Sequence, residues 1–233
     1  MAAARNIASL VKRLQPFNSC DAADALVKLG VPSGGFLPGL KAHSPSYLST
    51  QVKVIAPVQT IKFERNDQKG KKPEIVGHYV DQVKSGHVVF LSQPSGLSNA
   101  CWGGLMSMRS RHLGAVGTII DGNVRDIAEQ QSMEWPVFCR DVGTTAGAPV
   151  CFPSAIDVPV KLNDPREPDA TINPGDIIMA DADGIVCIPL ELAEKVAEMI
   201  PQLAEVDKLC GEDVLKGRSI TETFKERRGR LRC

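Results

Sequence analysis

Near the start of the chain, apolar positions repeat at the spacing of an α-helix. The pattern over residues 7–14 predicts one helix, which Pro16 ends. A second helix is predicted to begin at a cap on Ser19 or Asp21 and to end at Gly30. The chain is therefore expected to open on two helices.

The middle of the chain alternates between strand and helix patterns. Apolar and β-branched runs predict strands at Val52–Val58 (with Pro57 as a bulge or edge), Thr60–Phe63, His87–Leu91, Ala115–Ile120 and Trp135–Cys139. Helical spacing predicts helices at Val76–Val83, Asn99–His112 and Val124–Gln131. The polar stretch Arg65–Lys72 predicts an exposed loop, and Asp121-Gly122 predicts a turn. Such alternation is typical of a layered α/β core.

The second half of the chain is richer in short strands. They are predicted at Val158–Leu162, Ala170–Ile172, Asp176–Ala180 and Gly184–Ile188. An amphipathic helix is predicted at Leu190–Ile200. No internal repeat or linker is evident, so one α/β (α+β layered) domain is expected over residues 1–233. It would have N-terminal helices within 5–30, a core at about 50–200 and a helical tail at 202–233.

The composition narrows the class of protein. Apolar residues make up 43% of the 233 residues, and 27 basic residues balance 27 acidic ones, so we expect no nucleic-acid partner. The basic stretch Lys225–Arg232 fits either a solvated helix end or a weak anion patch. Seven scattered cysteines without a Cys-x-x-Cys pair disfavour a zinc ribbon or a thioredoxin-like site and fit reduced thiols in the cytoplasm.

The N-terminal segment bears on localisation. It reads as a helix rather than a secretory signal, and no run approaches the roughly 20 apolar residues that cross a bilayer. We therefore expect a cytoplasmic protein without a membrane partner. A mitochondrial presequence stays an alternative, because Arg5, Lys12 and Arg13 precede the first acid, Asp21.

The candidate chemistry is concentrated between Asn99 and Ala146. Arg125-Asp126 follow a predicted buried strand, and ligands collect at strand ends in layered α/β proteins. A carboxylate is a hard ligand suited to Mg²⁺ or Mn²⁺, and a guanidinium can grip a carboxylate or keto oxygen. Taken alone, however, the two residues are explained more simply as a solvated ion pair or a helix cap than as a ligand site.

Upstream glycines add to this picture. Gly103-Gly104 near a helix start would expose backbone N–H groups, which suit an anion, although paired glycines also serve close packing. Gly104 is followed after twenty residues by Arg125-Asp126, and after two more by Glu129. Helix, strand and turn fill the interval, so a chain reversal can bring the glycines near the Arg-Asp pair.

This spacing resembles the signature of the RraA-like family, which contains class II 4-hydroxy-4-methyl-2-oxoglutarate aldolases, oxaloacetate decarboxylases and regulators of ribonuclease E activity. The blocks CDAADAL, NACWGGLM, GTIIDGNVRD, VFCRDVGTTA and NPGDIIMADADGIVCIP agree with it, from about residue 20 to about residue 200. The resemblance implies an αββα sandwich assembled as a ring-shaped trimer or a dimer of trimers, with sites between subunits.

The resemblance also implies roles for individual residues. Asp126 would bind the divalent metal, Mg²⁺ or Mn²⁺, and Arg125 would contact the keto or enolate oxygen. Backbone amides of Gly103, Gly104, Leu105 and Met106 would hold the pyruvyl carboxylate. An acid from the neighbouring subunit would help to organise water; the candidates are Glu191, Glu194, Glu198 and Glu205, most of which belong to the wet side of a helix.

One departure from the family pattern affects the expected reaction. Aldolases of the family carry an acid at the position of Gly104, and aldol cleavage needs a base for the hydroxyl proton. Decarboxylation needs only a polarised carbonyl and protonation by water. The expected function is therefore a metal-dependent lyase that decarboxylates oxaloacetate to pyruvate and CO₂ through a metal-stabilised enolate, with aldolase activity as a further possibility. The alternative is a non-catalytic regulatory protein on the same scaffold.

Other polar residues have simpler structural explanations. Asp181 and Asp183 suit a hairpin turn better than a metal site, and His78 and His87 read as ordinary histidines rather than bases. Arg140-Asp141 is expected to be a structural ion pair, although it can line the same cavity. Thr144 and Thr145 lie in a turn that can approach the glycine loop. Trp102 and Met106 would suit a bulkier substrate.

Overall fold

The structure, a computed structural model, describes residues 2–67 and 75–230. Its helices are α1 (Ala2–Leu14), α2 (Ser19–Lys28), α3 (Gly104–His112), α4 (Ile127–Ser132), α5 (Ala193–Leu215) and α6 (Ile220–Arg227). Its strands are β1 (Lys41–Ser44), β2 (Val54–Arg65), β3 (Val88–Ser92), β4 (Ala100–Trp102), β5 (Gly117–Val124), β6 (Val137–Val142), β7 (Cys151–Ile156), β8 (Val160–Lys161), β9 (Thr171–Ile172), β10 (Ile177–Ala180) and β11 (Ile185–Ile188). Short 3₁₀ turns lie at Pro32–Gly35, Tyr79–Gln82, Leu190–Leu192 and Arg228–Arg230.

One curled sheet forms the centre of the molecule. Its strand order is β1-β6-β5-β3-β2-β10-β11, with β4 beside β5 and β7 beside β2. Strands β2, β3, β5 and β6 are parallel, whereas β1, β7, β10 and β11 pair antiparallel with their neighbours. The carboxyl ends of β5 and β6 therefore lie at the same edge, beside β4.

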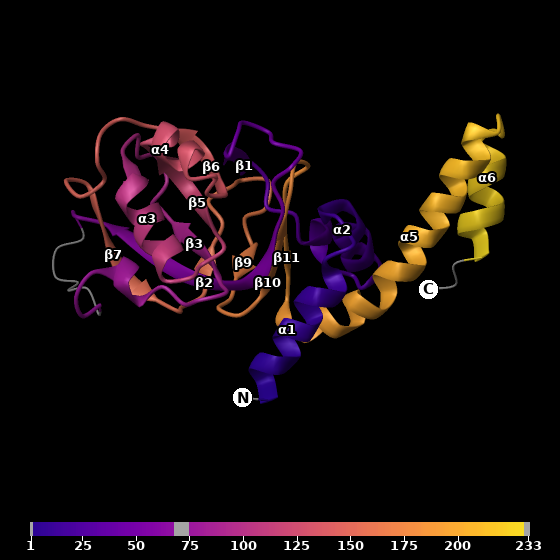
Figure 1. The fold of residues 1–233 in the computed structure, drawn as a ribbon, viewed down its shortest axis with the longest axis horizontal. Helices are drawn as coiled ribbons and strands as arrows, with labels where there is room; N and C mark the ends of the chain where they lie inside the picture. Colours follow the sequence, from indigo (N-terminus) through magenta and orange to yellow (C-terminus); the bar gives the residue numbers. More distant parts are fainter. Residues whose placement is uncertain (1, 68–74, 231–233) are drawn as a thin grey trace.

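Alternating side chains divide the interior into three apolar interfaces. In β3, Val88 and Phe90 pack inside the curl of the sheet, whereas Val89 and Leu91 face the α3 and α4 side. In β10, Ile178 packs inside the curl with Phe90, whereas its chain neighbours Ile177 and Met179 face the α1, α2 and α5 side. Three interfaces between four layers make an αββα sandwich, with α3 and α4 on one side and α1, α2 and α5 on the other (Figure 1).

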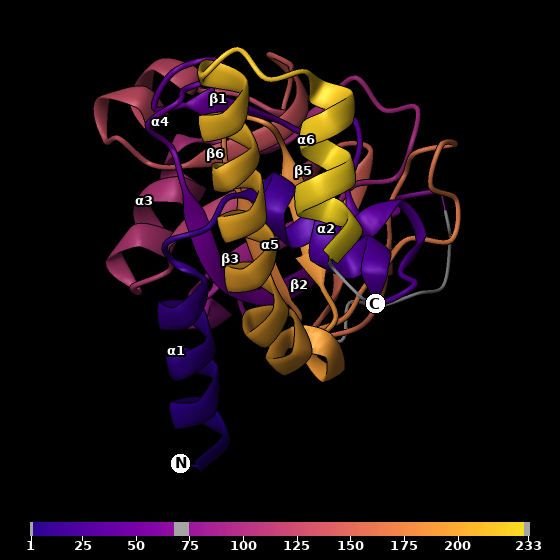
Figure 2. The same ribbon diagram turned by 90° about the vertical axis from the view of Figure 1, so that its right-hand side faces the viewer.

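Helix α5 continues beyond the domain and turns back as α6. Figure 2 shows the two helices side by side, and Figure 1 places them at the far end from α3. The expected tail boundary at residue 202 lies inside α5, which runs through Pro201. Asp213 holds the hairpin together, because its carboxylate accepts hydrogen bonds from Arg227 at 2.9 Å and Arg218 at 3.1 Å. We call α6 with the part of α5 after residue 202 the C-terminal arm.

The α/β class is confirmed, but several elements of the sequence prediction are wrong. The cap of α2 is Asn18, whose side chain accepts a hydrogen bond from the backbone of Asp21 in a capping box. The two strands predicted around Pro57 are one strand, β2. The helix predicted at Val76–Val83 is a short 3₁₀ turn, and the strands β1 and β7 had not been predicted.

Two further differences concern the region of the candidate site. The segment predicted as a helix from Asn99 begins as strand β4, and the helix starts only at Gly104. Asp121-Gly122 is not a turn but part of β5, where Gly122 lies so close to Gln93 that an added Cβ would be 2.5 Å from the Gln93 Cβ. The predicted loop over Arg65–Lys72 lies mostly outside the described residues.

Candidate functional site

Arg125 and Asp126 lie directly beyond β5, at the edge where the parallel strands end. The backbone N–H of Arg125 donates to the carbonyl of Trp102 at 3.0 Å, which continues the β4–β5 pairing to the pair itself. Asp126 then adopts a left-handed conformation, with φ of 61° and ψ of 38°, and begins α4. This sharp change of direction presents both side chains at the sheet edge, as expected for a ligand site of a layered fold.

The two side chains meet the glycine loop that the sequence analysis singled out. Asp126 Oδ2 accepts a hydrogen bond from the backbone N–H of Gly104 at 3.0 Å and lies 3.7 Å from Arg125 Nε. The side chains of Arg125 and Asp126 are 43% and 36% exposed. The predicted proximity of the glycines and the Arg-Asp pair is therefore present, and both charged groups retain surface for a ligand.

Because Gly103 and Gly104 have no side chains, the carboxylates of Asp126 and Glu129 can lie against them. A Cβ added at Gly103 would lie 2.6 Å from Asp126 Oδ2, closer than real Cβ contacts. A Cβ added at Gly104 would collide with the Glu129 carboxylate and lie 2.9 Å from its Cδ. Asp126 and Glu129 thus both reach the start of α3, and Glu129 occupies the space that an acid at position 104 would need.

The first turn of α3 offers backbone donors beside these carboxylates. Its N–H groups have no helical acceptor, which is general for a helix start. Gly104 donates to Asp126, whereas Leu105 and Met106 donate to no backbone acceptor within residues 2–67 and 75–230. Because the helix dipole is positive at this end, the two amides suit a small carboxylate.

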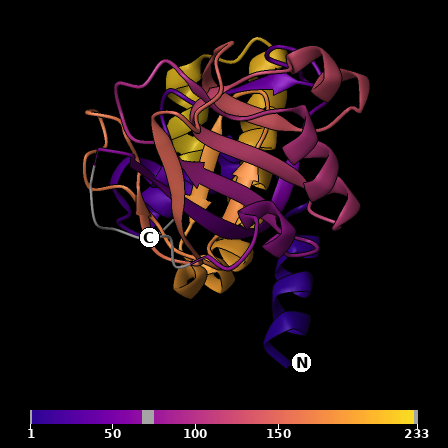
Figure 3. The same ribbon diagram turned by 90° about the vertical axis from the view of Figure 1, so that its left-hand side faces the viewer.

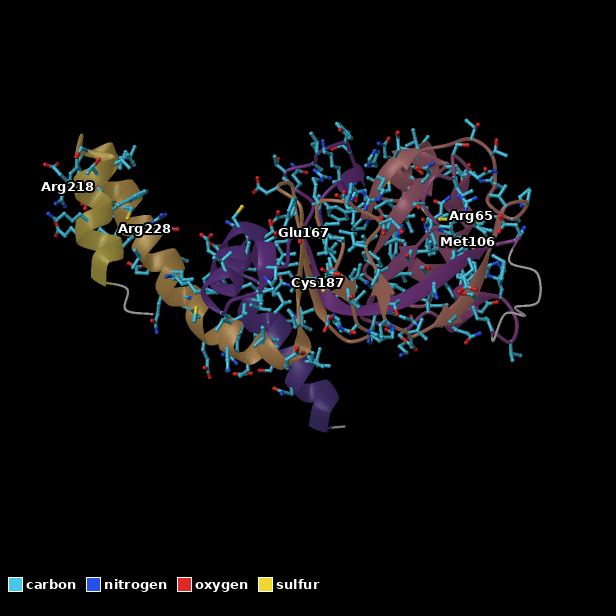
Figure 4. The ribbon with its side chains drawn as sticks, turned by 180° about the vertical axis from the view of Figure 1, so that it is seen from behind. Arg65, Met106, Glu167, Cys187, Arg218 and Arg228 are labelled. Carbon is cyan, nitrogen blue, oxygen red and sulfur yellow. The ribbon has the colours of Figure 1, made fainter. Side chains whose placement is uncertain are left out.

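A cavity of about 480 Å³ opens between this helix start and the strands. Its charged rim consists of Arg125 and Asp126, beside Gly103, Leu105 and Met106. The rest of its lining is mostly apolar and largely buried; it includes Phe63, Tyr79, Trp102, Cys151 and the half-buried Phe152. Figure 3 views the molecule from the side of α3 and α4, and Figure 4, where Met106 is labelled, shows the side chains from behind. The volume lies in the range of small-molecule sites.

The donor set at the rim fits a divalent ion with few protein ligands. Among the described residues, no three His, Cys, Asp or Glu side chains gather as a metal site. Asp126 retains acceptor capacity beyond its bond to Gly104, and Mg²⁺ is commonly held by one or two carboxylates with water and substrate completing the shell. A closed zinc-type site has no ligand set here.

Other candidates from the sequence have structural roles. Asp181 joins the turn between β10 and β11 to the start of α2, because its carboxylate accepts hydrogen bonds from the Ser19 N–H at 2.7 Å and from the Ser19 hydroxyl at 2.6 Å. Asp183 follows in the turn between β10 and β11 and donates its N–H to Asp181. His78 accepts from the N–H of Val80 at 3.3 Å and stacks on Tyr79.

Arg140 forms the predicted structural ion pairs, although with partners other than Asp141. Its guanidinium bonds Asp121, and it donates to Asp164 at 3.1 Å. Burial raises the pKa of Asp121, and Arg140 opposes that rise. A second arginine, Arg166, holds the pKa of Asp164 below its ordinary value. This network does not line the cavity.

Two of the four glutamates considered as neighbour-subunit acids form ion pairs within the chain. Glu194 pairs with Arg13, and Glu205 pairs with Lys208.

The turn after β6 approaches the glycine loop as predicted, because the carbonyl of Thr145 accepts a hydrogen bond from the N–H of Ala100 at 2.8 Å.

The six described cysteines are free. No described helix is long and apolar enough to cross a membrane.

The chain was compared with known proteins. A family model described as RraA-like: Aldolase/RraA matches residues 19–187. Protein DlpA of Legionella pneumophila is 30% identical over 188 residues, which are 81% of this chain but only 29% of DlpA. A putative 4-hydroxy-4-methyl-2-oxoglutarate aldolase of Halalkalibacterium halodurans is 27% identical over 176 residues, 75% of each protein.

Solved structures resemble the fold over most of its length. An uncharacterized protein from Pseudomonas syringae pv. tomato matches with a TM-score of 0.77 and 24% identity, covering 92% of this chain and 96% of that one. Streptomyces coelicolor RraAS2, described as an unusual member of the RNase ES inhibitor RraA protein family, matches with a TM-score of 0.69 and 25% identity, covering 90% and 96%.

Proposed function

This chain belongs to the RraA-like family, and from that premise we propose that it is a divalent-metal-dependent carbon–carbon lyase of small 2-oxo acids. The observation that carries the proposal is the meeting of Asp126, Arg125 and the start of α3 at the rim of one cavity. A relative named as a putative 4-hydroxy-4-methyl-2-oxoglutarate aldolase supports a lyase of this kind. Oxaloacetate is the simplest substrate of the class.

Each group at the rim has a role in the proposal. The N–H groups of Leu105 and Met106 bind the substrate's 1-carboxylate at the positive end of α3. Arg125 donates to the 2-keto oxygen, where negative charge develops as the bond breaks. Asp126 would hold a divalent cation, which would supply Lewis acidity to the site. The hydrogen bond from Gly104 keeps the Asp126 carboxylate turned toward the rim.

The bond changes of decarboxylation demand little more from the chain. The C3–C4 bond of oxaloacetate breaks and CO₂ leaves. The electron pair of the broken bond moves toward the keto oxygen and gives the enolate of pyruvate. Water then protonates C3. Aldol cleavage additionally needs a base for the C4 hydroxyl proton. Gly104 supplies none, so Glu129, whose carboxylate fills that space, is the proposed base for any aldolase activity.

Self-association is the proposed quaternary arrangement, as a trimer or a dimer of trimers. The C-terminal arm supports it, because it projects from the domain and α6 contacts chiefly α5. The neighbour would supply an acid to the rim. Glu194 already pairs with Arg13, so the better candidates are Glu191, in the 3₁₀ turn before α5, and Glu198, in the first part of α5; both are exposed.

The test is an oxaloacetate decarboxylation assay with Mg²⁺ or Mn²⁺, with and without EDTA. The variants are Asp126→Asn and the matched control Asp141→Asn. Asp141 is an exposed acid near the end of the neighbouring strand β6, and its carboxylate accepts a hydrogen bond from the N–H of Val142. We expect metal-dependent turnover in the wild type and in Asp141→Asn, and a loss of about 100-fold or more in Asp126→Asn. Absence of metal-dependent turnover, or full activity in Asp126→Asn, would contradict the proposal.

A regulatory protein without catalysis is the second candidate. The likeness to Streptomyces coelicolor RraAS2 favours it, since that protein is described as a member of an RNase ES inhibitor family. The two candidates differ in the assay above. A regulator requires neither the metal nor Asp126 for its activity, so a protein that is inert toward every 2-oxo acid would support the second reading.

A further inference from the structure

The inner part of the cavity is larger and less polar than a compact diacid requires. A four-carbon diacid, at less than about 30 Å³ for each non-hydrogen atom, fills little more than half of the 480 Å³. The remaining space is bounded by the side chains of Phe63, Tyr79, Trp102, Cys151 and Phe152. We call this part of the cavity the aromatic recess.

The recess offers no arginine or lysine for a second carboxylate. Among the described lining residues, the only arginine or lysine is Arg125, which lies beside Asp126. His78 also lines the cavity, but its Nδ1 already accepts the N–H of Val80 and its ring stacks on Tyr79. A carboxylate placed in the recess would lose its water without gaining a cationic partner, which costs several kcal/mol. An apolar group placed there gains instead from burial, and an aromatic one can also pack edge-on against the rings.

One polar group in the recess has no protein partner. Tyr79 is only 6% exposed; its ring packs edge-on against Phe63 at 5.4 Å and lies 6.3 Å from that of Trp102. No hydrogen bond joins its hydroxyl to any residue within 2–67 or 75–230. The hydroxyl is not itself fully enclosed, because Tyr79 lines the cavity, but tyrosine hydroxyls on largely buried rings usually have a partner. Burial, with Cys101 and Cys151 nearby, raises the pKa of Tyr79, so the hydroxyl keeps its proton as a donor at neutral pH.

We propose that the substrate of this chain is a 2-oxo acid with an aromatic group on C4, seated in the aromatic recess, and that Tyr79 is a specificity-determining residue that hydrogen-bonds a polar substituent of that ring. The proposal rests on the lyase function and names its substrate class. Pyruvyl atoms remain at Arg125 and the α3 amides, so the ring lies beyond the bond that breaks. Retro-aldol cleavage of such a substrate releases pyruvate and an aromatic aldehyde, as the hydroxyl proton passes to a base and C3 regains one from water.

The activity test compares three substrates by the rate of pyruvate release in the metal-loaded protein. They are 4-hydroxy-4-methyl-2-oxoglutarate, 4-hydroxy-2-oxo-4-phenylbutanoate and the para-hydroxyphenyl analogue of the latter. We expect kcat/KM to rise in that order, with the last step about five- to ten-fold, as for one buried hydrogen bond. Tyr79→Phe should remove that last step, so that the phenyl and para-hydroxyphenyl compounds are cleaved with the same kcat/KM.

The chain provides its own matched control, because its other tyrosine, Tyr47, is exposed and lies against His43 rather than in the cavity. Tyr47→Phe should behave as the wild type with all three substrates. If oxaloacetate is decarboxylated but the methyl-oxoglutarate is cleaved faster than both aromatic compounds, the inference is wrong while the lyase proposal stands. An unchanged preference for the hydroxyphenyl ring in Tyr79→Phe would overturn the role of Tyr79.

A binding measurement covers the case in which no substrate is turned over and the lyase proposal itself fails. Calorimetry compares 2-oxobutanoate with 2-oxo-4-phenylbutanoate, two acids that lack the C4 hydroxyl needed for cleavage. At least about ten-fold tighter binding of the phenyl acid is expected from burial of the ring. Equal affinity would overturn the recess as an aromatic site.

Discussion

Replacing Gly103 by alanine should disable the site while the fold survives. Gly103 has an extended backbone, with φ of −150° and ψ of −172°, which alanine adopts without strain. The new Cβ would lie 2.6 Å from Asp126 Oδ2, and Cβ contacts below 3.0 Å do not persist, so the carboxylate must retreat. Its other near neighbours, Arg125 Cγ at 3.3 Å and Nε at 3.4 Å, need only a small adjustment.

The magnitude follows from what the retreat breaks. The hydrogen bond from Gly104 to Asp126 is lost, and a bond to a charged group contributes about 1.5–3 kcal/mol to stability. Alanine also lowers the conformational entropy of the unfolded chain relative to glycine, which offsets about 0.4–1 kcal/mol of this loss. We therefore expect a net decrease of about 1–2 kcal/mol in the free energy of unfolding. Misplacing a reacting group by an ångström lowers turnover by about 100-fold, so activity should fall far more than stability.

Urea unfolding and metal-dependent oxaloacetate decarboxylation measure the two effects separately. The matched control is Gly211→Ala in α5, where an added Cβ meets nothing within 4 Å and alanine should stabilise the helix by up to about 1 kcal/mol. Activity of Gly103→Ala within two-fold of the wild type would refute the placement of Asp126 in the site. Unfolding of the variant would refute the inference that only the carboxylate has to move.

Three further predictions concern the fold and the arm. Leu14→Ala should lower the free energy of unfolding, measured in urea, by about 2–5 kcal/mol, because Leu14 is buried in the interface between helices α1, α2 and α5 and the sheet. The control Leu215→Ala, at an exposed position, should change it by less than about 0.5 kcal/mol. Asp213→Asn should speed hydrogen exchange in α6 without lowering the main unfolding midpoint, since its carboxylate joins α5 to Arg227 and Arg218; unchanged exchange would contradict this. Hydrogen bonds from Arg227 lower the pKa of Asp213 in the folded chain. The carboxylate's contribution to stability is therefore complete above the ordinary pKa of 3.8 and is lost as the pH falls below it. Circular-dichroism titrations of the wild type and of Asp213→Asn should differ by that loss.

The sequence predicted those elements whose side chains alternate or repeat cleanly. Strand β3 alternates Val88 and Phe90 with Val89 and Leu91 between two different interfaces, and both faces are apolar, so the run was recognisable. Helix α2 and the antiparallel strands β10 and β11 were found for similar reasons. The approach of the glycine loop to Arg125-Asp126 was also predictable from spacing, because only one strand and one helix separate them.

The errors arose where long-range contacts override local pattern. Asp-Gly usually marks a turn, but Asp121 is buried against Arg140 and Gly122 against Gln93, so the strand continues through both. Trp102 had helical spacing to Leu105 and Met106, yet pairing with β5 makes it part of a strand. Nothing local reveals that Tyr79 reaches the same cavity, since that depends on the 3₁₀ turn packing against β4 and β7.

The left-handed backbone of Asp126 limits how this site can change over generations. Aspartate and asparagine tolerate that conformation, glycine adopts it freely, and most other residues lose about 1–2 kcal/mol there. A lineage that retains the turn can therefore exchange the carboxylate for an amide by a conservative step, but other exchanges carry a stability cost as well as a chemical one. Diversification of substrate is then left to wall residues such as Phe63, Tyr79 and Phe152, which do not have a positive φ. Position 126 would remain the fixed point around which new specificities arise.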